Sequence, residues 1–244
     1  MSGDILYASG VILTGYMILG VTGFGSALFI VPLLAWKWTL PQVVLLTLLL
    51  DIPASLVFGG LNLKQVRFSE LWHLLPSMAV GSLIGLWLQG SVEPQWPVLT
   101  LGVYISLVGV RALLRASGDV LRSGTRWRPV AGFFAGLVEV MFATAGPIVL
   151  AWLQRRLPDV RAVRATTPTT MVVCATTAVA TIAMHGTLKD GQLWERWEAF
   201  VVLAMLGVAA GNRVARYVPA VVLARLVNGM LIASGVSLVV RSVL

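Results

Sequence analysis

The sequence predicts an all-α polytopic membrane protein built from two inverted repeats, each a broken-helix hairpin followed by three transmembrane helices. About eight to ten membrane segments are expected in all. Three observations predict this fold: the composition, a series of long apolar runs, and a break at corresponding places in the two halves. Of the 244 residues, 58% are hydrophobic and 11% are charged, and the mean hydropathy is +0.89. Soluble domains carry about 25% charged residues, so this chain cannot cover a water-facing surface.

Ten apolar blocks divide evenly between the two halves of the chain. They cover residues 5–22, 26–36, 40–62, 68–90 and 96–115, and then 130–145, 147–155, 164–187, 197–217 and 219–241. A helix needs about 20 residues to cross the hydrocarbon layer. Six blocks are therefore long enough to cross, and four are not. The short blocks form adjacent pairs, one pair at the start of each half.

Both short pairs are interrupted by residues that favour a break in the helix. The first contains three glycines within Gly20–Ser26, and the second runs Ala143-Thr144-Ala145-Gly146-Pro147. Glycine frees the backbone from helical geometry, and Pro147 suits the first turn of a new helix. One straight helix over residues 5–36 would be about 48 Å long, too long for a single crossing. We therefore expect each pair to be a helical hairpin that turns within the membrane.

The distribution of Lys and Arg tests the hairpin interpretation. If each pair returns to the side from which it enters, the 18 basic residues divide 14 to 4, whereas continuous crossings give 10 to 8. The smaller group is Lys37, Lys189, Arg196 and Arg241. Because basic loops stay in the cytoplasm, we expect both termini outside and the loop 111–128 inside. Re-entrant hairpins and two complete crossings by short helices fit this count equally well.

The net charge of +8 needs no nucleic-acid partner, because the basic residues are spread over many short loops and form no single patch. The expected surroundings are a bacterial-type inner membrane, with the lipid bilayer as the main contact. A homodimer is possible. The chain has one cysteine, Cys174, and no His-Glu-x-x-His sequence, so we expect neither a metal site nor a cofactor.

The two halves match at an offset near 120 residues. The segment 40–47 aligns with 160–167, and Gly25-Ser26 aligns with Ala145-Gly146. We therefore predict a first repeat over 1–118, a basic cytoplasmic linker over 119–129 and a second repeat over 130–244. With an odd number of crossings in each half, the second repeat is inverted. Inverted repeats with interrupted helices are typical of secondary transporters, although duplication can also produce a stable bundle without a transport role.

The residues around the first break resemble a known family. Gly23-Phe24-Gly25 with Pro32 and the segment 43–47 resemble the sulfite exporter family typified by the TauE and SafE proteins, and the segment 163–167 resembles its second repeat. The resemblance extends from about residue 5 to residue 243. It implies an inner-membrane carrier that exports sulfur-containing anions such as sulfite or organosulfonates. The chain departs from the family pattern at Ala143-Thr144-Ala145-Gly146, where that repeat usually carries a glycine cluster.

The breaks are candidate anion sites. A broken helix exposes backbone N–H groups where its second arm starts, with the positive end of the helix dipole behind them. Ser26 and Gly146 stand at these two starts, and Thr22 and Thr144 add hydroxyl groups beside them. The predicted substrate-binding residues of the breaks are Thr22, Gly23, Gly25, Ser26, Thr144 and Gly146. Alternatively, the hydroxyl groups only cap the broken helix ends.

Threonines within the membrane blocks are further candidates. Thr166 and Thr170 are four residues apart and share a helix face, and Thr47 lies on the equivalent helix of the first half. We expect some of these hydroxyls to line the path, although threonine often bonds to its own helix. Arg164 is a candidate for contact with a sulfonate at the inner mouth, although a side chain that only reaches the interface explains it equally well.

Two carboxylates fall at membrane depth, Asp51 in the middle of block 40–62 and Glu139 near the second break. An Asp there costs at least about 2.5–3.5 kcal/mol, so a functional role is the first interpretation. An acid beside an anion site is repulsive unless it is protonated or paired with a cation. We therefore predict that Asp51 and Glu139 couple transport to protons or another cation. A protonated carboxyl that only supports packing is the alternative.

Two other functions compete with a carrier. A passive anion channel would use the same glycines and polar helix starts, but it gains nothing from acids at the midplane. An intramembrane hydrolase would need His73 or His185 beside Ser26, and the sequence spacing does not predict that arrangement. We therefore expect a transporter and no enzyme.

Overall fold

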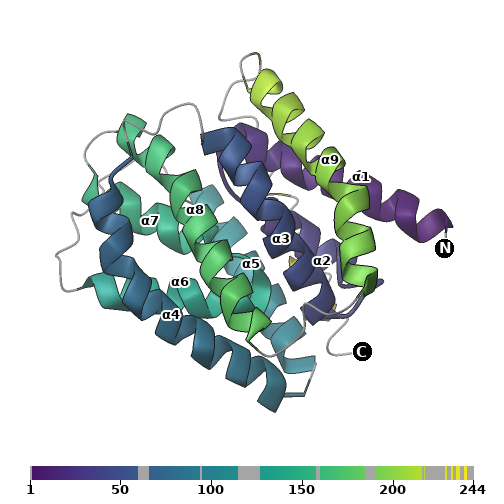
Figure 1. Ribbon diagram of the computed structural model, residues 1–244, viewed down its shortest axis with the longest axis horizontal. Helices are drawn as coiled ribbons and strands as arrows, with labels where there is room; N and C mark the ends of the chain where they lie inside the picture. Colours follow the sequence, from purple (N-terminus) through teal and green to yellow (C-terminus); the bar gives the residue numbers. More distant parts are fainter. Residues whose placement is uncertain are drawn as a thin grey trace.

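The computed structural model describes residues 2–59, 66–93, 95–114, 127–157, 160–184 and 191–215, with a few separate residues between 217 and 240. These ranges contain nine α-helices and no strand (Figure 1). The predicted block 219–241 falls almost wholly outside the described residues, as does the predicted linker 119–129 up to residue 126.

The helices begin and end close to the apolar blocks. In the first half they are α1 (Ser2–Thr22), α2 (Ser26–Leu34), α3 (Leu40–Gly59), α4 (Phe68–Ser91) and α5 (Gln95–Leu114). In the second half they are α6 (Arg128–Phe142), α7 (Gly146–Arg156), α8 (Val160–Ala183) and α9 (Gly191–Val214). Both predicted breaks are present, one between α1 and α2 and the other between α6 and α7.

Helices α1 and α8 begin before the apolar blocks that predict them. Asp4–Thr22 of α1 is one of five segments in the described residues that are long and apolar enough to span a membrane, so the expectation that block 5–22 is too short was wrong. The other four are Leu40–Phe58, Phe68–Ser91, Thr166–Ala183 and Gly191–Val214. Helix α8 starts at Val160 rather than residue 164, because a helix can continue past the hydrocarbon where its residues are charged. By contrast, α2 has 9 residues and α7 has 11, too few to cross.

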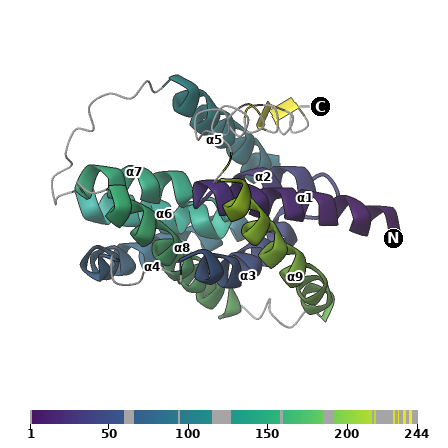
Figure 2. The same ribbon diagram turned by 90° about the horizontal axis from the view of Figure 1, so that it is seen from above.

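In each short pair, the end of the second helix lies beside the start of the first helix, so the chain reverses direction at the break. In the first pair, Lys37 after α2 forms an ion pair with Asp4 of α1 at 3.0 Å, and the Tyr7 hydroxyl donates to the Leu33 carbonyl at 3.1 Å. In the second pair, the first residue of α6 and the last residue of α7 meet at one carboxylate, as described below. Figures 1 and 2 show the two pairs toward opposite ends of the long axis.

An ion-pair network joins the start of α6 to the end of α7. Glu70, in the first turn of α4, accepts hydrogen bonds from Arg128 at 3.2 Å and from Arg156 at 3.0 Å. The Glu70 side chain is only 9% exposed. This ion pair network joins α4 of the first half to both arms of the second pair, and the sequence analysis did not predict it.

Glycines bring helices from the two halves into backbone contact. A Cβ atom on Gly136 of α6 would lie 2.1 Å from the Met78 carbonyl oxygen of α4, and a Cβ on Gly211 of α9 would lie 2.1 Å from the Met17 carbonyl oxygen of α1. A Cβ on Gly207, one turn before Gly211, would lie 2.7 Å from the Leu13 carbonyl oxygen of α1. Small residues four apart are the usual means of close helix packing in lipid, where apolar side chains gain nothing by leaving the hydrocarbon. The α4–α6 and α1–α9 pairs are therefore interlocked.

Large apolar side chains cover the outside of the bundle. Leu6 is 76% exposed, Trp72 is 71% exposed and Trp87 is 68% exposed. Many other large apolar side chains, among them Leu107, Phe134 and Met184, are also exposed. Together with the five candidate spans, this surface identifies a membrane protein.

We predict that Gly136→Ala and Gly211→Ala each lower the stability by about 1–3 kcal/mol, because the added methyl group forces two backbones apart. Thermal unfolding of the purified protein in detergent measures the effect. The matched control is Gly10→Ala in α1, where a Cβ meets nothing within 4 Å. Equal effects of Gly10→Ala and Gly136→Ala would contradict the interlock.

Candidate functional site

The first break is a sharp reversal made by two glycines. Gly23 has φ 83° and Gly25 has φ 92°, values that residues with a Cβ rarely adopt. The Thr22 hydroxyl lies within hydrogen-bond distance of the carbonyl oxygens of Ile18, at 2.8 Å, and Phe24. Thr22 therefore satisfies backbone groups that the reversal releases, and α2 begins at Ser26 without a side-chain cap.

The second break reaches a similar geometry without glycine at the end of its first arm. Ala143, which ends α6, has φ 56°, and its amide donates to the Glu139 carbonyl at 2.7 Å. The Ala145 amide donates to Glu139 Oε2 at 2.8 Å. Tyr104 of α5 donates its hydroxyl to the Thr144 carbonyl at 3.1 Å. Hydrogen bonds from neighbouring side chains thus hold this break in its left-handed conformation.

The two breaks meet at the centre of the molecule. A Cβ on Gly146, the first residue of α7, would lie 3.2 Å from the Phe24 ring, so the tip of one hairpin packs on the tip of the other. A cavity with an empty volume of about 300 Å³, including its open part, lies between them. Its lining comes from both breaks and from the middle of α3 and α8, and comprises Leu19, Phe24, Gly25, Ser26, Ala27, Leu28, Asp51, Ser55, Ala143, Thr144, Gly146, Pro147 and Met171.

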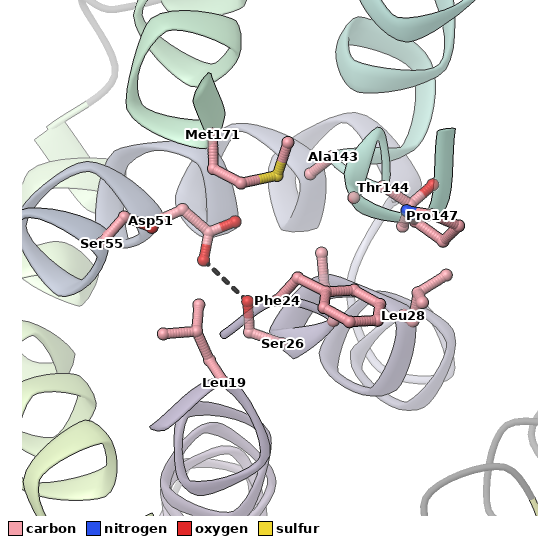
Figure 3. A pocket seen from close by; sticks show the side chains of 13 residues that line it. Leu19, Phe24, Ser26, Leu28, Asp51, Ser55, Ala143, Thr144, Pro147 and Met171 are labelled. Carbon is pink, nitrogen blue, oxygen red and sulfur yellow. Dashed lines mark hydrogen bonds between the residues drawn. The ribbon is translucent and has the colours of Figure 1, made fainter. Parts of the chain in front are cut away.

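Polar groups lie on two sides of this cavity, and apolar side chains lie between them. On one side the Ser26 hydroxyl donates to Asp51 Oδ1 at 2.9 Å. On the other side is Thr144, which is 2% exposed and whose hydroxyl has no hydrogen-bond partner. Phe24 and Met171 separate the two sides (Figure 3). A buried hydroxyl without a partner costs about 1–3 kcal/mol, so Thr144 marks a place where an acceptor is missing.

The two predicted coupling carboxylates are both buried near this centre. Asp51 is 8% exposed and Glu139 is 2% exposed. Asp51 lines the cavity. Glu139 lies beside it and reaches the second break through Ala145. Tyr16 of α1, which is fully buried, contacts Asp51 and donates its hydroxyl to the Thr47 carbonyl at 3.3 Å.

The structure brings together only part of the predicted substrate-binding set. Gly25, Ser26, Thr144 and Gly146 line the cavity. Thr22 and Gly23 shape the first break but are not part of the lining. Their predicted roles in substrate binding remain predictions.

The other threonines satisfy backbone groups away from the cavity lining. Thr47 donates to the Val43 carbonyl at 2.7 Å, and Thr170 donates to the Thr166 carbonyl at 2.8 Å. The Thr166 hydroxyl accepts a hydrogen bond from the Arg67 amide at 3.2 Å. These contacts are the ones that the structural alternative expects, and the roles of the three threonines in substrate binding remain predictions. The side chain of Arg164 lies outside the described residues.

Sequence reasoning did not single out several residues of the centre. Ser55 lies one helical turn after Asp51 and faces the same cavity, a spacing that was visible in the sequence. Met171 is the equivalent of Asp51 at the repeat offset of 120 residues. The repeat offset, applied to Asp51, would have identified Met171 as a residue of the site. Nothing in the sequence indicated the contribution of Tyr16, because it depends on how α1 packs on α3.

Comparison with known proteins agrees with this architecture. The chain matches the sulfite exporter TauE/SafE family over residues 7–238. It belongs to the TauE/SafE family. This TauE/SafE protein is therefore a membrane transporter, and the predicted resemblance is confirmed.

A curated relative supports the assignment. The TauE/SafE protein described here is 47% identical over 194 residues to a probable inner membrane transporter protein, TsaS, of Comamonas testosteroni. The alignment covers 79% of this chain and 81% of the relative. No solved structure matches the chain. Among the described residues of this TauE/SafE protein, no group of three or more His, Cys, Asp or Glu side chains could hold a metal ion.

We predict that Gly25→Ala destabilises the first break of the TauE/SafE protein by about 1–2 kcal/mol, because a Cβ is strained at positive φ. The nearest atom to that Cβ would be Leu28 Cδ1 at 3.8 Å, so the cause is backbone strain and not a clash. Ala143→Gly should leave stability unchanged or raise it. Thermal unfolding in detergent tests both, and a loss of stability in Ala143→Gly would contradict this explanation.

Proposed function

We propose that this protein is a secondary transporter that exports small sulfur-containing anions, sulfite or organosulfonates such as sulfoacetate, across the inner membrane. The anion binds in the cavity between the two helix breaks. The observation that carries this proposal is the unpartnered Thr144 hydroxyl, buried in a cavity that is also lined by the first turn of α2.

The donors available in this cavity suit an oxyanion. Ser26, Ala27 and Leu28 form the first turn of α2 and line the cavity, and first-turn amides have no partner within their own helix. The positive end of the helix dipole lies at the same place. Thr144 and Ser26 add hydroxyl groups from opposite sides. An anion can therefore be bound there without a buried arginine.

The packing of the helices supports an inverted repeat with alternating access. At the repeat offset, α1 corresponds to α6, α3 to α8, and α4 to α9. The close contact of α1 with α9 then corresponds to that of α6 with α4, and α3 packs against α9 as α8 packs against α4. Each interlocked pair joins one half of the chain to the other. In our proposal the two sets of helices rock about the central cavity, with the first repeat over 1–118 and the second over 130–244.

Asp51 and Glu139 supply the coupling. Two buried carboxyls beside an anion need a positive charge, and in our proposal a proton or another cation provides it. We assign the predicted sidedness, with both termini outside and the loop 111–128 in the cytoplasm, to the same transporter.

We predict that Ser26→Ala and Thr144→Val each reduce sulfonate flux in proteoliposomes about tenfold or more, since a hydrogen bond to a charged group contributes about 1.5–3 kcal/mol. The matched control is Thr176→Val, an exposed threonine on α8 whose hydroxyl bonds to the Val172 carbonyl of its own helix. Wild-type flux in Thr144→Val would contradict the proposed site.

The same vesicles separate a carrier from a passive channel. Saturable flux of sulfite or sulfoacetate that responds to an imposed cation gradient is expected for the carrier. Ungated anion current without counterflow would exclude the carrier and leave the channel.

A further inference from the structure

We propose that the carboxylates of Asp51 and Glu139 compete with the transported anion for hydrogen-bond donors at the two helix breaks. Each ionised carboxylate occupies a hydrogen-bond donor at one of the two helix breaks, and protonation releases that donor to the substrate. This inference rests on the proposed function, and it explains how proton and anion binding are linked.

The first competitor acts on the start of α2. The Ser26 hydroxyl is buried and donates to Asp51 Oδ1 at 2.9 Å. A carboxylate is itself a small oxyanion, so Asp51 stands where an oxygen of a sulfonate would bind. A hydrogen bond to an ionised acceptor is roughly twice as strong as one between neutral groups. The hydroxyl therefore stays with Asp51 while Asp51 carries its charge.

The second competitor acts on the start of α7. Glu139 Oε2 accepts the Ala145 amide at 2.8 Å, directly before the first residue of that helix. This amide belongs to the positive end of α7, where an anion is stabilised. The carboxylate thus already occupies one donor of the second break, while the neighbouring Thr144 hydroxyl has no partner. Of the Thr144 hydroxyl, the Ser26 hydroxyl and the Ala145 amide, the first has no partner and the other two are held by carboxylates.

Among the residues that the structure describes, no Lys or Arg forms an ion pair with Asp51 or Glu139. The described side chains near Asp51 include Tyr16 on α1, Ser26 on α2 and Glu139 on α6. Glu139 interacts in addition with Tyr104 on α5 and Cys174 on α8. None of these neighbours, which come from the described part of the chain, is a Lys or Arg. In our proposal a mobile cation neutralises their negative charge, and a proton does so while also breaking the competition.

Protonation changes the chemistry at the cavity in two ways. The proton comes from water and forms an O–H bond on a carboxylate oxygen, so the carboxyl loses its charge. The Ser26 hydroxyl or the Ala145 amide can then turn to the substrate, and the new carboxyl O–H is an additional donor. Anion binding is thus strengthened as the pH falls.

The two carboxylates do not occupy equivalent positions in the two repeats. At the offset of 120 residues, Asp51 corresponds to Met171 and Glu139 corresponds to Leu19, and both counterparts line the cavity as apolar side chains. Each repeat therefore contributes one acid at a different position. This arrangement gives each break its own carboxylate, one from α3 and one from α6.

The test is calorimetric binding of methanesulfonate, which remains a monoanion over the range, to the purified full-length protein between about pH 5 and about pH 8. We expect wild-type affinity to rise about tenfold or more toward low pH. Asp51→Asn should bind more tightly than wild type at high pH, and Asp51→Asn combined with Glu139→Gln should bind with no pH dependence. Asp4→Asn and Glu198→Gln, which remove carboxylates outside the cavity, are the controls and should behave like wild type.

A double-mutant cycle separates competition from simple charge repulsion. If Asp51 competes for the Ser26 hydroxyl, Ser26→Ala weakens binding strongly at low pH and weakly at high pH, and the gain from Asp51→Asn shrinks in its presence. Additive effects of the two substitutions would leave repulsion only and overturn the competition. Wild-type pH dependence in the double carboxylate variant would overturn it as well. Absence of binding in every variant at every pH would overturn the proposed function itself. Thermal unfolding confirms that each variant is folded.

Discussion

Interrupting a helix inside a bilayer leaves peptide groups without partners, and in lipid there is no water to replace those partners. The centre of this protein is organised around that constraint. Thr22 lies beside the carbonyl oxygen released at the first break, and Tyr104 and Glu139 bind the peptide groups of the second. The polar and acidic side chains at membrane depth are therefore needed first to hold two breaks open. In our proposal a small anion replaces one of these groups.

The short arms α2 and α7 cannot hold this centre by their own packing. With 9 and 11 residues, they depend on the long helices around them. The glycine contacts of α4 with α6 and of α1 with α9 fix the first arm of each hairpin against a helix of the other half. The Trp197 indole of α9 donates to the Leu49 carbonyl of α3 at 3.1 Å and adds another link between the halves. The two hairpin tips are consequently brought together by elements that are far apart in the sequence.

Local features were predictable from the sequence, and pairings between distant residues were not. Both breaks follow from glycine and proline chemistry, and an Asp or Glu within an apolar run has to face the protein interior. The contact between Ser26 and Asp51 joins residues 25 apart on different helices and depends on the angle between α2 and α3. The threonines show a local contact that competes with the predicted one. A helical threonine hydroxyl can reach the carbonyl one turn earlier, and Thr47 and Thr170 both donate to that carbonyl. Their place on the path stays a prediction.

The central claim is that the anion binds between the two helix breaks. The most direct measurement is an experimental structure with 2-bromoethanesulfonate, in which anomalous scattering locates the bromine and the density shows the sulfonate. The account predicts a sulfonate within hydrogen-bond distance of Thr144 and the first turn of α2, in the cavity that Phe24 and Met171 also line. Occupancy at the Arg128 and Arg156 bridge with an empty central cavity would contradict it.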